Sequence, residues 1–278
     1  MFSSNPFVEL SSSISPGVMQ GFVILMAILV VAGTLFDVIH KKSAQYFFEN
    51  MEAAKKRSRR EVSGGEKVSL AVQTAVSEVL TSSEFCNARR RVAHLLTMYG
   101  LIIHIIATVA LTFGYPTMAE AGVWPLLWHL GALSVCVGGY WFWFFIRVDV
   151  AAEGTSPFKL MRADLFVLSL LASMTMALLW SWTQGSGLGW LFFALYIGSS
   201  VVLFGGVPWS KFAHMFFKPA AAYQKKITKA DGSQENLPDL GDLSDPELQA
   251  KFPDIPTYMG EKPPYMGLGI KRETPNHY

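Results

Sequence analysis

RRRVAHLLTMYGLIIHIIATVALTFG, residues 89–114, is the stretch that decides the fold. It opens with three arginines and then stays apolar for long enough to cross a bilayer, since a spanning helix needs about 20 mostly apolar residues. His94 and His104 lie inside it, and an ionisable side chain at mid-membrane costs roughly 3 kcal/mol or more. We therefore expect a function for these histidines, above all for His104 among its isoleucines.

The composition of the chain indicates an integral membrane protein. Of its 278 residues, 51% are hydrophobic and 13% aromatic, and the mean hydropathy is +0.31. Five apolar segments have the length of spanning helices. They are, approximately, residues 17–39, 92–114, 124–146, 163–183 and 188–207. The sequence thus predicts an all-α fold, an integral membrane five-helix bundle.

The basic residues lie on one side of the predicted bundle. The N-terminus, residues 115–123 and residues 184–187 contain no Lys or Arg. All 23 basic residues lie in residues 40–91, in residues 147–162, or from Lys211 onward. Because cytoplasmic loops carry the excess of Lys and Arg, the pattern predicts an N-terminus outside and a C-terminus in the cytoplasm.

This topology divides the chain into three regions. Residues 1–16 are expected to form a short outer tail, residues 17–217 the transmembrane domain, and residues 218–278 an extended cytoplasmic tail. The proline-rich tail cannot bury a core of its own, so it is either free or wrapped around a partner protein.

The cytoplasmic loop 40–91, which belongs to the transmembrane domain, is long enough to hold two helices. The first has an amphipathic basic pattern, and the second begins with Ser63 and Glu66 in the spacing of a capping box. The loop is either a collar on anionic lipid headgroups or a docking platform for a soluble subunit.

The topology also decides which histidines lie at one depth. The second helix enters with His94 from the cytoplasmic side and the fifth leaves there with His214, so these two are candidates to hold one haem iron. His104 lies ten residues, or about 15 Å, deeper than His94, and its counterpart is His129 or a group near Tyr196. Two imidazoles fill both axial positions of a haem, which suits electron transfer.

Other metal centres are disfavoured by the sequence. Cys86 and Cys136 are too few for an iron–sulfur cluster, which usually needs four thiolates. A zinc site is unlikely to be compact, because the histidines lie at different levels and no carboxylate or thiolate joins them. Any iron–sulfur chemistry is therefore expected on another subunit.

The arrangement of spans and histidines resembles a known family. Five spans with an outer N-terminus, two histidines ten residues apart on the second, and one at the cytoplasmic end of the fifth resemble the haem b gamma subunit of respiratory nitrate reductase. The pattern covers about residues 17–217. EFCNARRRVAHLLTMYG (84–100) and GGYWFWFFIRVDVAAEG (138–154) look most like the quinone-interacting membrane-bound oxidoreductase, and like the membrane subunit associated with dissimilatory adenylylsulfate reductase.

The resemblance implies specific haem ligands. His94 and His214 would share the cytoplasmic haem b, and His104 would bind an outer one. The family has a second histidine on the fifth helix, 18 residues before the last, where this chain has Tyr196. Either His129 replaces it or only one haem binds.

The resemblance also implies a function. The chain would be a cytochrome b-type subunit of the bacterial inner membrane that transfers electrons between the quinone pool and a cytoplasmic flavin and iron–sulfur enzyme, with adenylylsulfate reductase of dissimilatory sulfur metabolism as the expected partner. No pattern indicates substrate chemistry of its own or nucleic-acid binding. The alternative is a haem-free anchor that recruits a soluble redox enzyme, in which His104 is hydrogen-bonded to a group such as Tyr196 or Thr108.

Overall fold

The predicted all-α fold is confirmed. The computed structural model describes residues 2–40, 45–83, 85, 87–149, 154–210, 214–233 and 246–251. Within these ranges the chain forms helices and their connections, and no strand. Five helical segments are long and apolar enough to cross a membrane: Pro16–Ile39, Ala88–Gly114, Trp124–Ile146, Arg162–Trp182 and Gly187–Gly205. They match the five predicted spans within a few residues.

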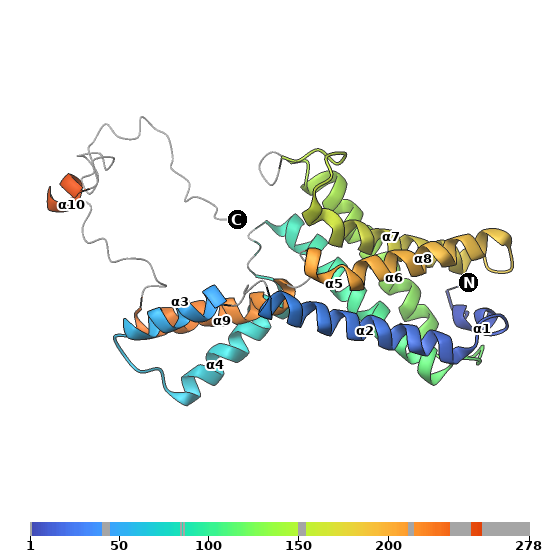
Figure 1. Ribbon diagram of the computed structural model, residues 1–278, viewed down its shortest axis with the longest axis horizontal. Helices are drawn as coiled ribbons and strands as arrows, with labels where there is room; N and C mark the ends of the chain where they lie inside the picture. Colours follow the sequence, from blue (N-terminus) through green and yellow to red (C-terminus); the bar gives the residue numbers. More distant parts are fainter. Residues whose placement is uncertain are drawn as a thin grey trace.

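These segments contain the main helices of the bundle (Figure 1). They are α2 (Pro16–Ile39), α5 (Ala88–Val109), α6 (Trp124–Trp141), α7 (Leu165–Trp182) and α8 (Gly187–Gly205). Single π-helical segments extend α5 as Ala110–Gly114 and α6 as Phe142–Ile146. After α8, Pro208 lies in a short 3-10 turn, Val207–Trp209, because proline cannot donate the next helical hydrogen bond.

The helices pack in two close pairs, α5 with α6 and α7 with α8, which are joined by α6 against α7. Gly100 and Gly131 lie where α5 and α6 touch through their backbones. Helix α2 packs on α8 at the margin of the bundle, where only 11% of its most apolar stretch is buried by protein. The rest of that apolar surface is available to lipid.

The N-terminal segment is packed into the bundle, unlike the polar tail expected from its composition. A short helix, α1 (Pro6–Ser11), is capped by Asn5, whose side chain also donates to the Tyr115 carbonyl at 2.8 Å. Phe7 and Leu10 are buried in the core beside Trp128. Two apolar residues on one face of a helical turn are enough for this packing, although the average composition is polar.

A buried ion pair braces the connection between α6 and α7. Arg147 Nη2 donates to Asp164 Oδ2 at 2.6 Å and to the Lys159 carbonyl at 2.9 Å. The Arg147 side chain is 1% exposed, and its guanidinium lies 3.9 Å from the centre of the Trp143 ring. The pair fixes both ends of a connection whose residues 150–153 lie outside the description.

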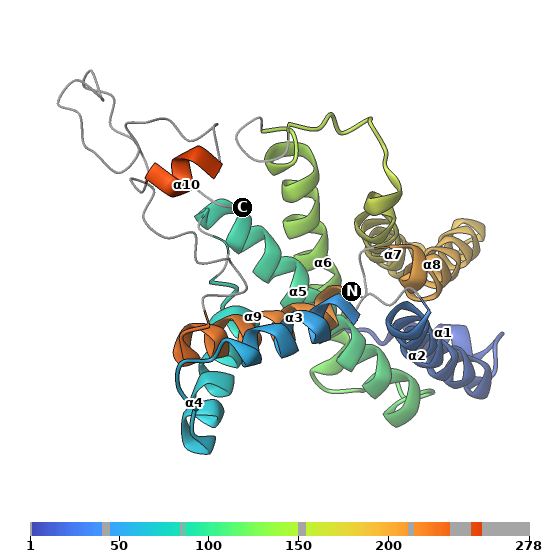
Figure 2. The ribbon, with the colours of Figure 1, turned by 60° about the vertical axis from the view of Figure 1, so that its left-hand side comes forward.

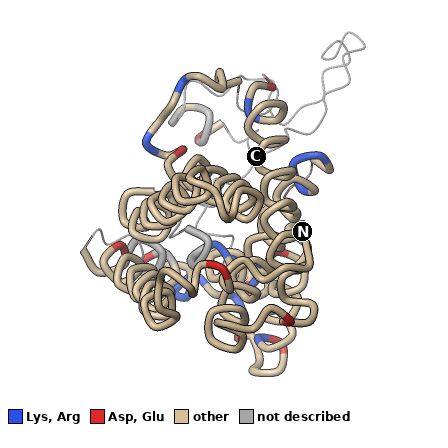
Figure 3. Tube along the Cα trace, turned by 90° about the vertical axis from the view of Figure 1, so that its right-hand side faces the viewer, with Lys and Arg blue, Asp and Glu red and all other residues tan. Residues whose placement is uncertain are grey.

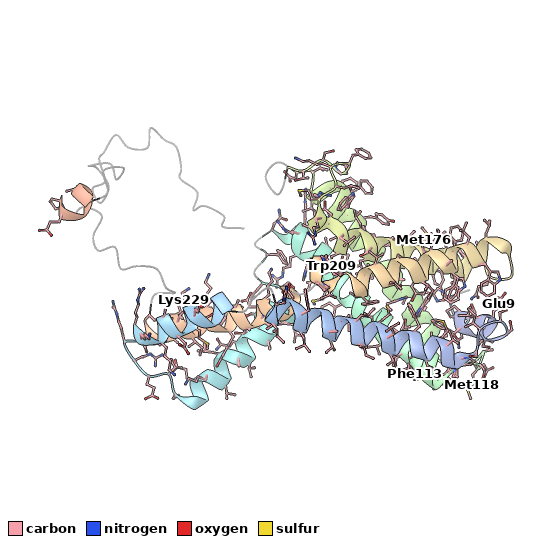
Figure 4. The ribbon with its side chains drawn as sticks, viewed as in Figure 1. Glu9, Phe113, Met118, Met176, Trp209 and Lys229 are labelled. Carbon is pink, nitrogen blue, oxygen red and sulfur yellow. The ribbon has the colours of Figure 1, made fainter. Side chains whose placement is uncertain are left out.

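Helices α3 (Gln45–Lys56), α4 (Gly64–Thr74) and α9 (His214–Asp231) form a lobe outside the bundle. Helix α9 packs along α4 and α3, and Figure 2 also shows α3 beside α9. In Figure 4, Glu9 lies at one end of the bundle, Trp209 at the other, and Lys229 beyond it on the lobe. The lobe projects past the end of α2 (Figure 1).

Arg60 connects the parts of this lobe. Its Nε donates to the Ala230 carbonyl at 2.6 Å, near the end of α9, and its Nη1 donates to Glu66 at 3.0 Å. The hydrogen bond from Arg60 lowers the pKa of the Glu66 carboxyl below its ordinary value. Ser63 Oγ accepts from the Glu66 amide at 3.3 Å, so the serine half of the predicted capping box is present, whereas the Glu66 carboxylate accepts from Arg60.

Helix α9 enters the region expected to be an extended tail. It continues past Pro219 to Asp231, so residues 218–231 are helical and packed on the lobe. Its Thr228 and Asp231 are buried. A further short helix, α10, spans Pro246–Lys251, and residues 234–245 and 252–278 lie outside the described residues.

Candidate functional site

Helix α5 places its two histidines on different faces. Ten residues turn an α-helix by about 280°, so His94 and His104 do not share a face. The buried residues of α5 recur at helical spacing and include Ala93, Gly100 and His104. His104 is therefore directed into the bundle, with 2% of its surface exposed, whereas His94 is exposed beside the lobe.

Helix α6 fixes the ring of His104. Its Nδ1 donates to the Trp128 carbonyl at 2.9 Å, because a carbonyl can only accept. The remaining nitrogen, Nε2, then carries a lone pair and faces the Tyr196 hydroxyl at 3.5 Å. An Nδ1 proton held by a backbone carbonyl is also the tautomer found in many histidine metal ligands. The tautomer thus suits either a metal ligand or a hydrogen-bonded core histidine.

The space around His104 is filled by aromatic rings. The Trp128 ring is fully buried, with its centre 4.8 Å from that of His104. Trp180 and Tyr196 stack at 5.9 Å between centres, and Phe7 meets Trp180 edge-on at 5.6 Å. A flat macrocycle on His104 requires at least Trp128 or Tyr196 to move. The residues around His104 therefore do not fit a haem in this arrangement.

His129 has its own partners and does not face His104 as a second axial ligand would. Its Nδ1 donates to the Pro125 carbonyl at 2.6 Å, and its Nε2 accepts from the Ser181 hydroxyl at 2.7 Å. The Phe2 ring meets its edge with 5.4 Å between centres. The structure thus places His129 in the core near the N-terminal segment, in a hydrogen-bonded site of its own.

His94 lies against the short segment between the lobe and α5. Its Nδ1 is 3.1 Å from Ser82 Oγ, and its ring centre is 4.9 Å from that of Phe85. Phe85 is also approached by two cations, with Arg90 Cζ at 5.6 Å and Lys218 Nζ at 5.4 Å from the ring centre. Phe85 therefore connects His94 with helix α9.

His214 is the first residue of α9, and its side chain lies outside the described residues. Lys218 follows it by four residues, about one turn along α9. Because Lys218 reaches Phe85, the first turn of α9 lies near His94. Arg90 and Lys218 place two cations on the Phe85 ring beside His94, and such cations can pair with carboxylates of a ligand.

Sequence reasoning missed three residues of these sites, namely Ser82, Phe85 and Ser181. Ser82 and Phe85 lie in a connection without periodicity, and Ser181 is one of several hydroxyls on an otherwise apolar helix. Tyr196, in contrast, was named from the sequence, because the haem-free anchor alternative expects it or Thr108 as a hydrogen-bond partner of His104. Its hydroxyl is the group that faces His104 Nε2.

Comparisons with known proteins give a limited match. No protein-family model matches the chain, and no solved structure matches it. The citrate utilization protein B of Escherichia coli is 31% identical to it over 160 residues. This match covers 55% of the chain and 41% of the relative, so the chain spans about two fifths of that protein's length. The matches do not extend to the haem b gamma-subunit family that the sequence resembles.

Proposed function

We propose that this helical membrane protein is a cytochrome b-type subunit that binds one haem b between His94 and His214. In this role it carries electrons between the quinone pool and a cytoplasmic redox enzyme. The observation that carries the proposal is the position of Phe85, which contacts the His94 ring at 4.9 Å and Lys218, one turn into α9, at 5.4 Å. This contact links the segment beside His94 to the first turn of the helix that begins at His214.

The residues of this region have separate roles in the proposal. His94 and His214 hold the iron, and Arg90 and Lys218 neutralise the carboxylates. A bound haem b would supply a one-electron carrier, which His94 and His214 would hold. The aromatic ring of Phe85 would add an apolar surface beside it.

We propose one haem rather than two. A second haem on His104 and His129 requires both rings to exchange their hydrogen-bond partners and the buried Trp128 to move. Packed aromatic cores resist such rearrangement, since a void or an overlap costs a few kcal/mol. His104 then serves the bundle as a hydrogen-bonded polar residue.

The orientation of the proposal follows the charges. Every described Lys and Arg lies in the lobe, at the start of α5, at the α6–α7 connection or in α10. The Lys and Arg residues are blue in Figure 3. The helix ends on the opposite side carry none. This distribution supports a cytoplasmic lobe and an N-terminus outside, and residence in the bacterial inner membrane is part of the proposal.

The lobe is the proposed contact for the soluble partner. It projects from the end of the bundle that carries His94, so a partner bound there lies close to the proposed haem (Figure 1). Adenylylsulfate reductase is the partner that the family resemblance suggests, whereas the relative in Escherichia coli is named for citrate utilization. Co-purification from the native host would distinguish a flavin and iron–sulfur enzyme of sulfur metabolism from an enzyme of citrate use.

A second candidate function is favoured by the outer histidines. Each ring nitrogen of His104 and His129 has a hydrogen-bond partner within the protein: Trp128, Tyr196, Pro125 or Ser181. Such satisfied histidines are what a haem-free anchor predicts. In that case the lobe recruits a soluble enzyme and the bundle carries no electrons.

A reduced-minus-oxidised spectrum with haem stoichiometry tests the proposal. The full chain is purified in detergent from a host that makes haem. We expect one haem b per chain, lost alike in His94→Ala and His214→Ala and retained in His104→Ala and His129→Ala. No haem in the wild-type chain favours the anchor, and two haems contradict the single-site proposal. Unequal loss between the first two variants contradicts the pairing.

A further inference from the structure

Ser82 has a backbone conformation that serine rarely adopts. Its φ is 47°, and it is the one non-glycine residue with positive φ in the described part of the chain. Its side chain is almost completely buried, with 1% exposed. Strained backbone of this kind persists only where the surroundings hold it, and it often accompanies a functional site.

Helix α5 supplies the groups that hold this segment. The carbonyls of residues 80–81 accept from Tyr99 Oη at 2.6 Å and from Arg91 Nε at 2.7 Å. The next residue, Ser82, contacts His94 Nδ1 through its hydroxyl at 3.1 Å. Three successive residues are thus bound by side chains from three turns of one helix. These contacts hold the serine and the two residues before it against α5.

From this we infer that Ser82 is a positioning residue for His94. In this proposal the Ser82 hydroxyl accepts the Nδ1 proton across the 3.1 Å contact, so that Nε2 carries the lone pair. This assignment rests on the proposed function, in which Nε2 binds the haem iron. It gives His94 the same tautomer as His104 and His129, whose Nδ1 atoms donate to backbone carbonyls.

The residue type at this position supports the inference. Glycine adopts positive φ without the steric cost that serine carries, so the backbone alone would favour glycine. Serine adds a hydroxyl, and that hydroxyl is the group that reaches His94. Partners that hold the second nitrogen of a histidine ligand typically change metal affinity by about 10- to 100-fold.

The test compares Ser82→Gly and Ser82→Ala in the full chain. Both remove the hydroxyl, but only glycine relieves the backbone, so the two variants separate a local folding effect from an effect on His94. Ser83→Ala is the matched control, because the Ser83 hydroxyl approaches Glu78 at 3.4 Å. The first readout is nitrogen NMR of labelled histidines in haem-free protein, and the second is haem affinity by titration.

We expect the wild-type chain and Ser83→Ala to show His94 protonated on Nδ1, and both Ser82 variants to lose that state. Haem affinity should fall about 10- to 100-fold in both variants. An unchanged His94 tautomer in Ser82→Gly overturns the inference, as does wild-type haem affinity in that variant. If the wild-type chain binds no haem but shows the expected tautomers, the proposed function fails while the assignment of Ser82 to His94 stands.

Discussion

The contact between α5 and α6 is tight enough for a single methyl group to test it. A Cβ atom on Gly131 would lie 2.7 Å from the His104 amide nitrogen, 2.8 Å from the Gly100 carbonyl oxygen and 3.0 Å from His104 Cα. All three are backbone atoms, which cannot turn away as a side chain does. Gly131→Ala therefore requires the two helices to separate by several tenths of an ångström.

The expected cost follows from this overlap. Inserting a methyl group into a packed core costs about 1–3 kcal/mol, and contact with backbone on both sides places this variant near 3 kcal/mol. Gly198 in α8 is the matched control, because a Cβ there meets nothing within 4 Å. Alanine at that position should stabilise the helix by about 0.5–1 kcal/mol. The two variants should thus differ by roughly 4 kcal/mol.

The assay is reversible unfolding of the purified chain in mixed micelles, followed by helical circular dichroism. Gly131→Ala should unfold at a lower denaturant fraction than the wild-type chain, and Gly198→Ala at an equal or higher one. The displaced α6 should also lengthen the bond between His104 and the Trp128 carbonyl, which is 2.9 Å in the wild-type chain. Equal stabilities for the two alanine variants would refute the close helix contact.

Two further perturbations test the packing that the structure adds to the sequence. Asp164→Asn leaves the Arg147 guanidinium, which is 1% exposed, without its charge partner. This should lower the unfolding free energy by about 3–5 kcal/mol. A loss below about 1 kcal/mol would show that water reaches the arginine. Phe7→Ala removes a buried ring that meets Trp128 at 6.0 Å and Trp180 at 5.6 Å between centres, and should cost about 3–5 kcal/mol. The tryptophan emission should move to longer wavelength in this variant, and an unchanged spectrum would mean that α1 does not cover the core.

The spanning helices were accessible to sequence reasoning because their signals are local. A run of about 20 apolar residues determines a span whatever its neighbours are. Pro208 stops the continuation of the last spanning helix because proline has no backbone N–H to donate. Ser63 caps α4 through residues only three positions away. These features depend on distances along the chain.

The tertiary structure decided the contacts that depend on how each helix turns about its own axis. Arg147 and Asp164 are 17 residues apart, and no period in the sequence indicates that they meet. The same holds for Ser82 and His94, since the serine reaches the histidine only because α5 holds the carbonyls beside it. Hydropathy places a residue in a membrane, but the rotation and approach of neighbouring helices select its partner.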